Sequence, residues 1–332
     1  MTAHVVVTGG AGFIGSHLCA RLCADGHRVL CLDNLDGFYT PALKQANLYR
    51  LQQDADVASR FTFCQGDIRD PATLQRLFQA EPIDVVIHLA AMAGVRPSIE
   101  RPLLYGDVNI QGTLNLLEAC RRFQVRYFLF GSSSSVYGAR TRGPFAEDED
   151  VNTPVSPYAA TKRAGELLCY TYSHLFAMRI VCLRFFTVYG PGQRPDLAIH
   201  KFARLMAQGQ PLPIYGDGTS QRDYTYVDDI VDGVVRSWLW LQQGNTHPGI
   251  CEIFNLGGAH PIPLLQLVRL LETALDCKAT IDWQPDQPGD VPVTFADLRK
   301  SQSVLGYHPQ VDIATGIQHF AAWFQQQSFQ YL

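Results

Sequence analysis

A glycine-rich turn between an expected strand and an expected helix limits the fold of this chain more than any other feature. Residues 8–16 read TGGAGFIGS. The β-rich run at residues 4–7 stands directly before them, and Leu18 and Leu22 keep helical spacing behind them. Glycines in that position punctuate a strand-to-helix turn. The chain is therefore expected to begin with a strand, a tight turn and a helix.

Three glycines of this turn have separate tasks in such a unit. Gly9 takes backbone angles that other residues avoid, Gly12 leaves room for a pyrophosphate beside main-chain N–H groups, and Gly15 lets the helix pack closely on the strand. The phosphates then lie at a helix N-terminus. A second apolar run, residues 28–32, ends at Asp33, near the spacing at which a carboxylate binds the ribose of adenosine and repels a 2′-phosphate. The pattern favours NAD over NADP, whereas the glycine motif alone also fits a turn without a ligand.

Composition narrows the partners of the chain. A net charge of -4 with no run of Lys or Arg leaves no electrostatic footprint for nucleic acid or an acidic membrane surface. No apolar segment has the length of a membrane span and no charged leader precedes the first strand, so we expect a cytoplasmic protein. The 9 cysteines form no C-x-x-C motif and no Cys/His cluster, which predicts reduced thiols and no metal site.

Strand-like runs recur with helical stretches between them. They lie at residues 5–8, 29–32, 61–65, 85–89, 127–131 and 180–184. This alternation predicts an α/β fold, a doubly wound parallel sheet of the Rossmann type with helices on both faces. Such sheets bind ligands beyond the carboxyl ends of their strands. Two segments stand at those ends, Asp67-Ile68 and Leu89-Ala90-Ala91, although each alone is also typical of a turn or a cap.

The pattern changes after residue 184, where prolines and a GDG turn interrupt the alternation. A second, smaller lobe is expected to begin near Phe186. Further elements are a helix at 228–241 and a strand at 252–256 that rejoin the sheet, and helices at 262–275 and 314–324 that close the second lobe. The predicted domains are residues 1–185 with 226–257 for the dinucleotide, and residues 186–225 with 258–332 for the substrate.

A tyrosine and a lysine stand four residues apart in the most specific segment after the glycine turn. Ser156 is a good N-cap and Pro157 a good first helical residue, so Tyr158 and Lys162 lie on one face of a helix. An ammonium group beside a phenol favours the phenolate and lowers the pKa of the tyrosine. Tyr158 then becomes a base that can take a proton from a sugar hydroxyl. An incidental surface pair is the alternative.

A serine-rich turn follows the fifth expected strand, where residues 131–138 read GSSSSVYG. A hydroxyl from Ser133 would hydrogen-bond the substrate oxygen that loses its proton, and would complete a Ser–Tyr–Lys set. Four serines are equally typical of a plain turn, and spacing alone does not select the one that faces a substrate.

Eight segments occur in the order, and over nearly the whole length, that is typical of one family: TGGAGFIGSHL, LDNL, HLAA, SSSSVYG, YAATK, RFFTVYGPGQRPD, RDYTYVDDI and QPGD. On these segments the chain resembles the extended short-chain dehydrogenases/reductases that act on nucleotide sugars, and within them the UDP-glucuronate 4-epimerases. The resemblance implies NAD-dependent epimerisation at carbon 4 of a UDP-sugar, from UDP-glucuronate to UDP-galacturonate. Tyr158 would take the proton of the 4-hydroxyl while NAD takes a hydride, which leaves a transient 4-keto sugar.

The resemblance also implies a set of site residues. Those expected to touch NAD are Phe13, Ile14, Asp33, Asn34, Asp67, Ile68, Leu89, Ala90, Asn109, Tyr158, Lys162 and Phe186, with Ala91 beside them. Those expected to touch the substrate are Thr187 at the sugar, Arg222 at the diphosphate, Asp290 at the uridine ribose, and Ser133, which the following Val-Tyr-Gly selects, with Ser134 next to it. Thr187 and Gln287 replace the Asn and Arg of UDP-glucose 4-epimerases, and both replacements occur in the uronate branch.

Several other functions stay open. A UDP-glucose 4-epimerase is one. Dehydratases of the family carry an Asp-Glu pair where this chain has Ser134 and Ser135. A decarboxylase is another candidate, because a 4-keto uronate is a β-keto acid. A non-catalytic NAD-sensing protein of the same fold would be expected to lose Tyr158 or Lys162, and this chain keeps both.

An arginine at the sugar would favour uronate substrates. Arg194 stands just beyond Thr187, where a short hydroxyl leaves room for a carboxylate and a guanidinium can bind it bidentately. Arg96 is the other candidate. Alternatively, Arg194 pairs with Asp196 or lines the phosphate site.

The family further suggests a homodimer. Pro97 and Pro102 stand at the start of an expected helix that runs to about Arg122 and holds Asn109. This helix and the helix of Tyr158 would form the contact. Their leucines, which are either the outward face or part of the core, are Leu114, Leu117, Leu167 and Leu168.

Overall fold

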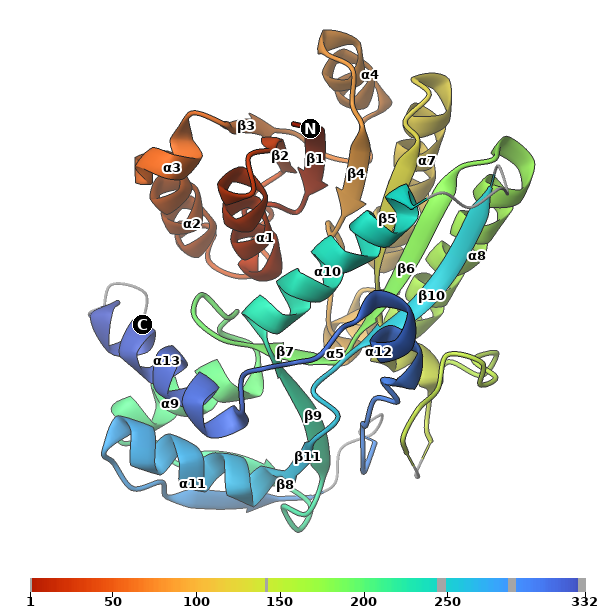
Figure 1. Cartoon of the computed structure of the whole chain (residues 1–332). Helices are drawn as coiled ribbons and strands as arrows, with labels where there is room; N and C mark the ends of the chain where they lie inside the picture. The colour runs from red at the N-terminus through yellow and green to blue at the C-terminus, as the bar shows by residue number, and fades with distance from the viewer. Residues whose placement is uncertain (1, 141–142, 244–248, 286–290, 328–332) are drawn as a thin grey trace.

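The central sheet of the computed structural model has the predicted architecture. The structure describes residues 2–140, 143–243, 249–285 and 291–327. Within them, a seven-stranded sheet has the order β10-β6-β5-β4-β1-β2-β3, and its neighbouring strands run parallel (Figure 1). The strands are β1 (His4–Thr8), β2 (Arg28–Asp33), β3 (Phe61–Gln65), β4 (Val85–His88), β5 (Tyr127–Ser133), β6 (Arg179–Phe185) and β10 (Ile250–Leu256). Each lies where the sequence predicts it, to within two residues at either end, so the doubly wound fold is confirmed.

Burial on both faces explains why these strands form. Val5, Val6 and Val7 have 0% exposed surface, with the first and third facing one hydrophobic cluster and Val6 the other. Continuous apolar strands of this kind are typical of a parallel sheet with helices on both sides. The first cluster packs against α1 (Phe13–Ala24), α2 (Pro41–Gln53), α3 (Ala55–Ala58) and α10 (Val227–Gln242), and the second against α4 (Pro71–Ala80), α7 (Gly112–Arg122) and α8 (Pro157–Phe176).

The order of the strands reverses beside β1. Its neighbour on one side is β2, the next strand of the chain, whereas its neighbour on the other side is β4. Open α/β sheets bind ligands in the crevice outside the carboxyl ends at such a switch point. The glycine turn follows β1 directly, so the fold places it at this crevice.

The helix expected from Pro97 and Pro102 to about Arg122 is interrupted. It consists of α5 (Val95–Glu100), α6 (Pro102–Gly106), a π-helical turn η1 (Asp107–Gln111) and α7. The break falls at Arg101, whose φ of -130° lies outside the helical region, because a residue before proline is pushed toward extended angles. Single π-helical turns are frequent at functional sites, and this one carries Asn109.

The second lobe lies below the carboxyl edge of the sheet in Figure 1. Its elements are a sheet of β11 (Pro261–Pro263), β9 (Gln221–Tyr226) and β7 (Thr187–Tyr189), a pair of β12 (Ile281–Gln284) and β8 (Leu212–Tyr215), and helices α9 (Ala198–Ala207), α11 (Leu264–Leu275) and α13 (Ile313–Gln326). The helix expected from residue 262 begins at Leu264, because the residues before it pair with β9 as a short strand. The domain bounds stay a prediction. Helix α12 (Arg299–Leu305), expected in the second lobe, packs on α10 and β10 of the sheet.

Most of the leucines considered for a dimer contact belong to the core. Leu117 has 0% exposed surface, and Leu114 and Leu168 pack against the same cluster. Leu167 is 52% exposed. Periodicity alone did not assign these four leucines to the inward or the outward face of their helices.

Three further properties concern the whole described chain. None of its helices combines the length and the apolar character that crossing a bilayer requires. Every cysteine is a free thiol, and six of them are buried. Among the described residues, no group of His, Cys, Asp and Glu side chains is placed to hold a metal ion.

Candidate active site

A pocket opens at the switch point and collects most of the predicted site residues. Its lining includes Gly9, Gly12, Phe13, Ile14, Gly15, Asp33, Asn34, Asp67, Ile68, Leu89, Ala90, Ala91, Ser133, Ser134, Tyr158, Lys162, Phe186, Thr187 and Arg194. These residues come from the ends of five strands, from the segment that follows β6 and from helix α8, which carries Tyr158 and Lys162. The sequence motifs therefore converge on one cavity.

Two glycines of the turn, Gly9 and Gly15, have no room for a side chain. Gly9 has a φ of +71°, and a Cβ atom there would lie 2.8 Å from the backbone nitrogen of Ala90. A Cβ atom at Gly15 would lie 2.2 Å from the carbonyl oxygen of Gly9. Gly12 is the N-cap of α1 and brings no side chain of its own to cap the first turn of the helix. This cradle fits a pyrophosphate held by main-chain N–H groups.

Acidic side chains hold the neighbouring strand ends in place. The carboxylate of Asp33 accepts hydrogen bonds from the backbone N–H of Leu35 at 2.8 Å and of Ala11 at 3.2 Å. The carboxylate of Asp67 accepts from the side-chain amide of Asn34 at 2.9 Å. Hydrogen bonds from Arg69 lower the pKa of Asp67 to about 2. This end of the pocket therefore carries two carboxylates and is already ordered by its own hydrogen bonds.

The Tyr–Lys helix begins as predicted. The hydroxyl of Ser156 accepts a hydrogen bond from the N–H of Ala159 at 3.1 Å, and Pro157 is the first helical residue. The ammonium group of Lys162 donates to the carbonyl oxygen of Gly131 at 2.7 Å and lies 6.0 Å from the ring centre of Tyr158. Burial lowers the pKa of Lys162 to about 8.

The expected effect of Lys162 on Tyr158 is not found. Burial raises the pKa of Tyr158 above its ordinary value, and the groups that oppose this rise are Ser133, through a hydrogen bond, and Arg194, through its charge. The ammonium group of Lys162 instead donates its hydrogen bond to the carbonyl oxygen of Gly131 in β5. Spacing along a helix put the two side chains on one face, but it did not specify where the ammonium group points.

Ser133 lies at the end of β5 and caps the 3₁₀ turn η2 (Ser134–Tyr137). Its hydroxyl accepts from the N–H of Ser135 at 3.1 Å and donates to the hydroxyl of Ser135 at 3.2 Å. Ser133 also opposes the rise that burial causes in the pKa of Tyr158, and it is the serine of the turn that acts on the tyrosine in this way.

A buried ion pair supports α8, and the sequence analysis did not identify it. Glu166 accepts from two nitrogens of Arg184 at 2.9 and 3.0 Å and from the hydroxyl of Ser132 at 2.7 Å. These contacts fasten α8 to β5 and β6. A charged residue four positions after Lys162, on the same buried face, was the available signal.

Asn109 lies behind the pocket wall rather than in its lining. Its amide accepts from the N–H of Met92 at 2.8 Å, donates to the carbonyl oxygen of Met92 at 2.9 Å, and donates to the hydroxyl of Thr161 at 3.0 Å. It thereby joins the segment after β4 to α8. The structure gives Asn109 a supporting position.

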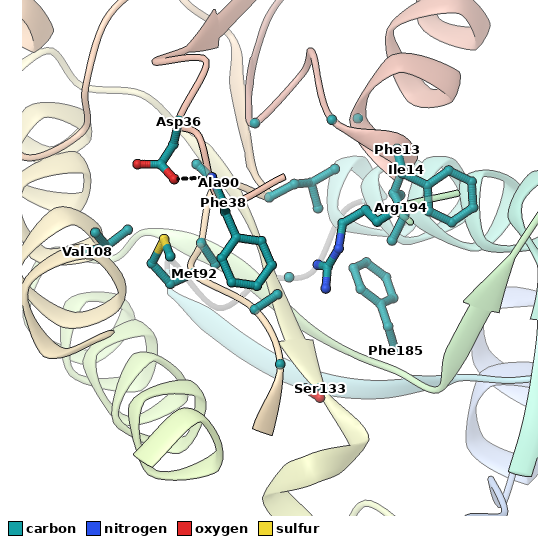
Figure 2. Close-up of a pocket in the computed structure, with 18 of the residues that line it drawn as sticks. Phe13, Ile14, Asp36, Phe38, Ala90, Met92, Val108, Ser133, Phe185 and Arg194 are labelled. Carbon is teal, nitrogen blue, oxygen red and sulfur yellow. Dashed lines mark hydrogen bonds between the residues drawn. The ribbon is translucent and has the colours of Figure 1, made fainter. Parts of the chain in front are cut away.

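The sugar end of the pocket contains one of the two candidate arginines. Arg194 points into the cavity between the rings of Phe38 and Phe185 (Figure 2). Its guanidinium carbon is 5.3 Å from the ring centre of Phe38, and its nitrogens bind both carboxylate oxygens of Asp196 at 2.7 and 3.0 Å. The alternative pairing with Asp196 is therefore present, in a residue that also lines the pocket.

Three other expected substrate residues are absent from the described lining. Arg96 lies over the ring of Tyr215, 4.8 Å from its centre. Arg222 donates to the carbonyl oxygen of Gln221 at 2.9 Å. Asp290 lies outside the described residues. The lining also holds residues that the sequence analysis did not select, which include Phe38, Tyr39, Lys44, Met92 and Ser135.

Comparison with known proteins places the chain in a family. Residues 5–257 match the model of the NAD dependent epimerase/dehydratase family. The chain belongs to this family. A UDP-glucuronate 4-epimerase of Thermodesulfobacterium geofontis is 41% identical over 97% of this chain and 96% of that protein. UDP-glucuronate 4-epimerase 3 of Arabidopsis thaliana is 41% identical over 96% of this chain and 76% of that protein.

Solved structures give the same relationship. The UDP-glucuronic acid 4-epimerase of Bacillus cereus, in complex with UDP-glucuronic acid and NAD, has a TM-score of 0.88 against this chain. The two are 38% identical over 98% of this chain and 99% of that one. The resemblance inferred from the sequence motifs is thus confirmed at the level of the whole chain.

Proposed function

We propose that this protein is an NAD-dependent 4-epimerase that interconverts UDP-glucuronate and UDP-galacturonate. The observation that carries the proposal is one pocket in which a pyrophosphate cradle, a Ser–Tyr–Lys set and an inward arginine meet. The relatives that bear this activity in their names match almost the whole chain.

The residues present fit NAD. The glycine turn would hold the pyrophosphate, Asp33 and Asn34 the adenosine ribose, Asp67 and Ile68 the adenine, and Leu89, Ala90, Ala91 and Phe186 the walls around the dinucleotide. The exclusion of side chains at two positions of the cradle supports this assignment, since Cβ atoms at Gly9 and Gly15 would meet backbone within 3 Å. When bound, NAD accepts a hydride from carbon 4 of the sugar and returns it to the opposite face.

Tyr158 moves the proton. Its phenolic oxygen takes the proton of the 4-hydroxyl, and returns it after the 4-keto sugar has turned over. A hydrogen bond with Ser133 and the charge of Arg194 favour the ionised phenol. Ser133 also donates to the sugar oxygen in this proposal. Lys162, anchored to the end of β5, keeps a positive charge beside the reacting atoms.

Contacts to the UDP part of the substrate keep it bound while the sugar rotates. Thr187 faces the sugar, Arg222 binds the diphosphate and Asp290 lies near the uridine ribose in this proposal. Remote binding energy of this kind retains an intermediate that would otherwise escape.

Arg194 binds the carboxylate of the uronate. Its place in the pocket lining supports this role over Arg96, which lies against Tyr215 in the second lobe. A carboxylate held in the plane of the sugar cannot align its bond with the carbonyl π system, so this grip also suppresses loss of carbon dioxide from the keto intermediate. Dehydration is disfavoured because Ser134 and Ser135 provide neither acid nor base.

We also place the enzyme in the cytoplasm as a homodimer. Apolar side chains stand exposed on α6 and α8, two helices in contact: Leu103 at 88%, Leu167 at 52% and Tyr170 at 62%. A second copy of the chain that packs on this face would cover them.

Product analysis tests the reaction. Purified protein is incubated with UDP-glucuronate, and in parallel with UDP-glucose, and the nucleotide sugars are separated by chromatography. UDP-galacturonate is the expected product. Faster turnover of UDP-glucose would overturn the uronate assignment, UDP-pentose as the main product would identify a decarboxylase, and no conversion of any nucleotide sugar would favour a sensor.

A further inference from the structure

Lys44 lies beside Asp33 in the pocket. Its ammonium nitrogen is 3.5 Å from a carboxylate oxygen of Asp33, and both residues line the cavity. The two side chains are only 9% and 5% exposed. Lys44 belongs to α2, whereas Asp33 ends β2, so folding brings together two residues that no sequence motif connects. The acidic residue at the ribose end is thus accompanied by a cation.

Both groups are fixed in place. Asp33 is tied by the backbone N–H groups of Ala11 and Leu35, so its carboxylate cannot turn away from the pocket without losing those bonds. The ammonium group of Lys44 also lies 5.2 Å from the ring centre of Tyr39. A buried ammonium needs such partners, because leaving water is costly for an unpaired charge.

The two groups have opposite preferences for the adenosine ribose. A carboxylate accepts hydrogen bonds from the 2′-hydroxyl of NAD and repels the 2′-phosphate of NADP. An ammonium group attracts a phosphate as a point charge, and more strongly in a buried site than in water. The choice between the cofactors is therefore a balance between neighbouring charges.

We propose that Lys44 is a second determinant of cofactor choice, and that it is a latent site for a 2′-phosphate. With Asp33 present, Lys44 reduces the ratio of the affinity for NAD to the affinity for NADP, but NAD still binds more tightly. Once the charge of Asp33 is removed, Lys44 holds the 2′-phosphate and the pocket accepts NADP. This inference rests on the proposed function, since it takes a nicotinamide dinucleotide as the ligand.

A cofactor-retention assay tests it without measuring turnover. Each full-length protein is incubated with NAD and a larger, fixed amount of NADP, desalted and denatured, and the released cofactors are quantified by chromatography. Asp33→Asn should shift the NADP:NAD ratio upward by roughly ten- to a hundredfold, the usual range for a charge-assisted hydrogen bond. Lys44→Met should lower the NADP:NAD ratio by about tenfold. The double variant, Asp33→Asn with Lys44→Met, should not show the increase in this ratio that Asp33→Asn alone shows.

Two controls separate charge from packing. Lys44→Arg keeps the cation and should leave the ratio near that of the wild type. Lys278→Met removes the lysine of another ion pair, which lies 3.3 Å from Glu272 and is not part of the pocket lining, and should leave the NADP:NAD ratio unchanged. Thermal denaturation checks that each variant is folded.

Two results would overturn the inference. One is a double variant that retains as much NADP as Asp33→Asn does. The other, which stands even if the Asp33 variants do not fold, is an unchanged ratio in Lys44→Met. A wild-type protein that retains neither cofactor would instead contradict the proposed function.

Discussion

The cofactor end and the sugar end of the pocket are built differently. The cofactor end is made by residues at the carboxyl ends of consecutive strands, where the register of the sheet fixes each position. The sugar end is made by segments after β6, where Arg194 reaches the cavity and meets Phe38 from the loop after β2. Strand ends are positioned by local pattern, whereas segments of two lobes meet only through the complete fold.

The largest expected effect concerns the group that both ends share. Tyr158→Phe removes the proton acceptor and leaves the cradle intact, so turnover of UDP-glucuronate should fall about a thousandfold while bound cofactor stays at the wild-type level. Tyr170→Phe, an exposed tyrosine on the same helix, is the matched control and should keep full activity. Activity of Tyr158→Phe within a few-fold of the wild type would reject the proton path.

The second prediction concerns a substitution that disrupts only the cofactor end of the pocket. Gly15→Ala forces a Cβ atom to 2.2 Å from the backbone oxygen of Gly9, which should cost roughly 1–3 kcal/mol of stability and eject the cofactor. Gly106→Ala is the control, because no atom lies within 4 Å of its new Cβ. Unfolding in urea and cofactor content measure both. Wild-type retention in Gly15→Ala would show that the turn does not form the cradle.

A third test acts on the sugar end. Arg194→Ala should lower kcat/KM for UDP-glucuronate by about ten- to a hundredfold more than for UDP-glucose, because a charged hydrogen bond contributes roughly 1.5–3 kcal/mol. It should also release some UDP-pentose. Arg222→Ala, which removes a proposed diphosphate contact, should lower kcat/KM for both substrates by the same factor. Equal loss on both sugars in Arg194→Ala would move that residue to the nucleotide.

The same contrast explains what the sequence could predict. The strands and the glycine turn follow from local pattern, and β3 has the expected bounds. The break at Arg101 follows from Pro102, which restricts the backbone of the residue before it. The orientation of Lys162 follows from the strand that its ammonium group meets. Lys44 carried no motif, since only the placement of α2 brings it to the pocket.

Arginine positions were the least predictable. Long side chains have several rotamers, and the choice between Arg96 and Arg194 depended on neighbours from distant segments. Tyr215 lies under the first and Phe38 under the second. Hydrophobic periodicity contains no information on such aromatic partners.

The smallest expected effect tests whether the cofactor end is ordered before any ligand binds. Hydrogen bonds from Arg69 lower the pKa of Asp67 from 3.8 to about 2. The folded state therefore binds fewer protons than the unfolded state between these values, so this stability is present above pH 3.8 and is lost as the pH falls through about 2. Because the carboxyl is partly exposed, solvent screening reduces the contribution to about 1 kcal/mol.

Urea unfolding at pH 6 and at pH 2.5 measures this contribution. Asp67→Asn should destabilise the protein at pH 6 and much less at pH 2.5, and it should also weaken retention of the cofactor. Asp297→Asn is the matched control, because Asp297 has a lowered pKa and an arginine two residues on, Arg299, but lies outside the pocket lining. Like Asp67→Asn, that variant should be destabilised at pH 6 and much less at pH 2.5, but it should retain the cofactor. An equal loss of cofactor in both variants would mean that general stability, rather than the preformed carboxylate, decides how the cofactor end binds its ligand.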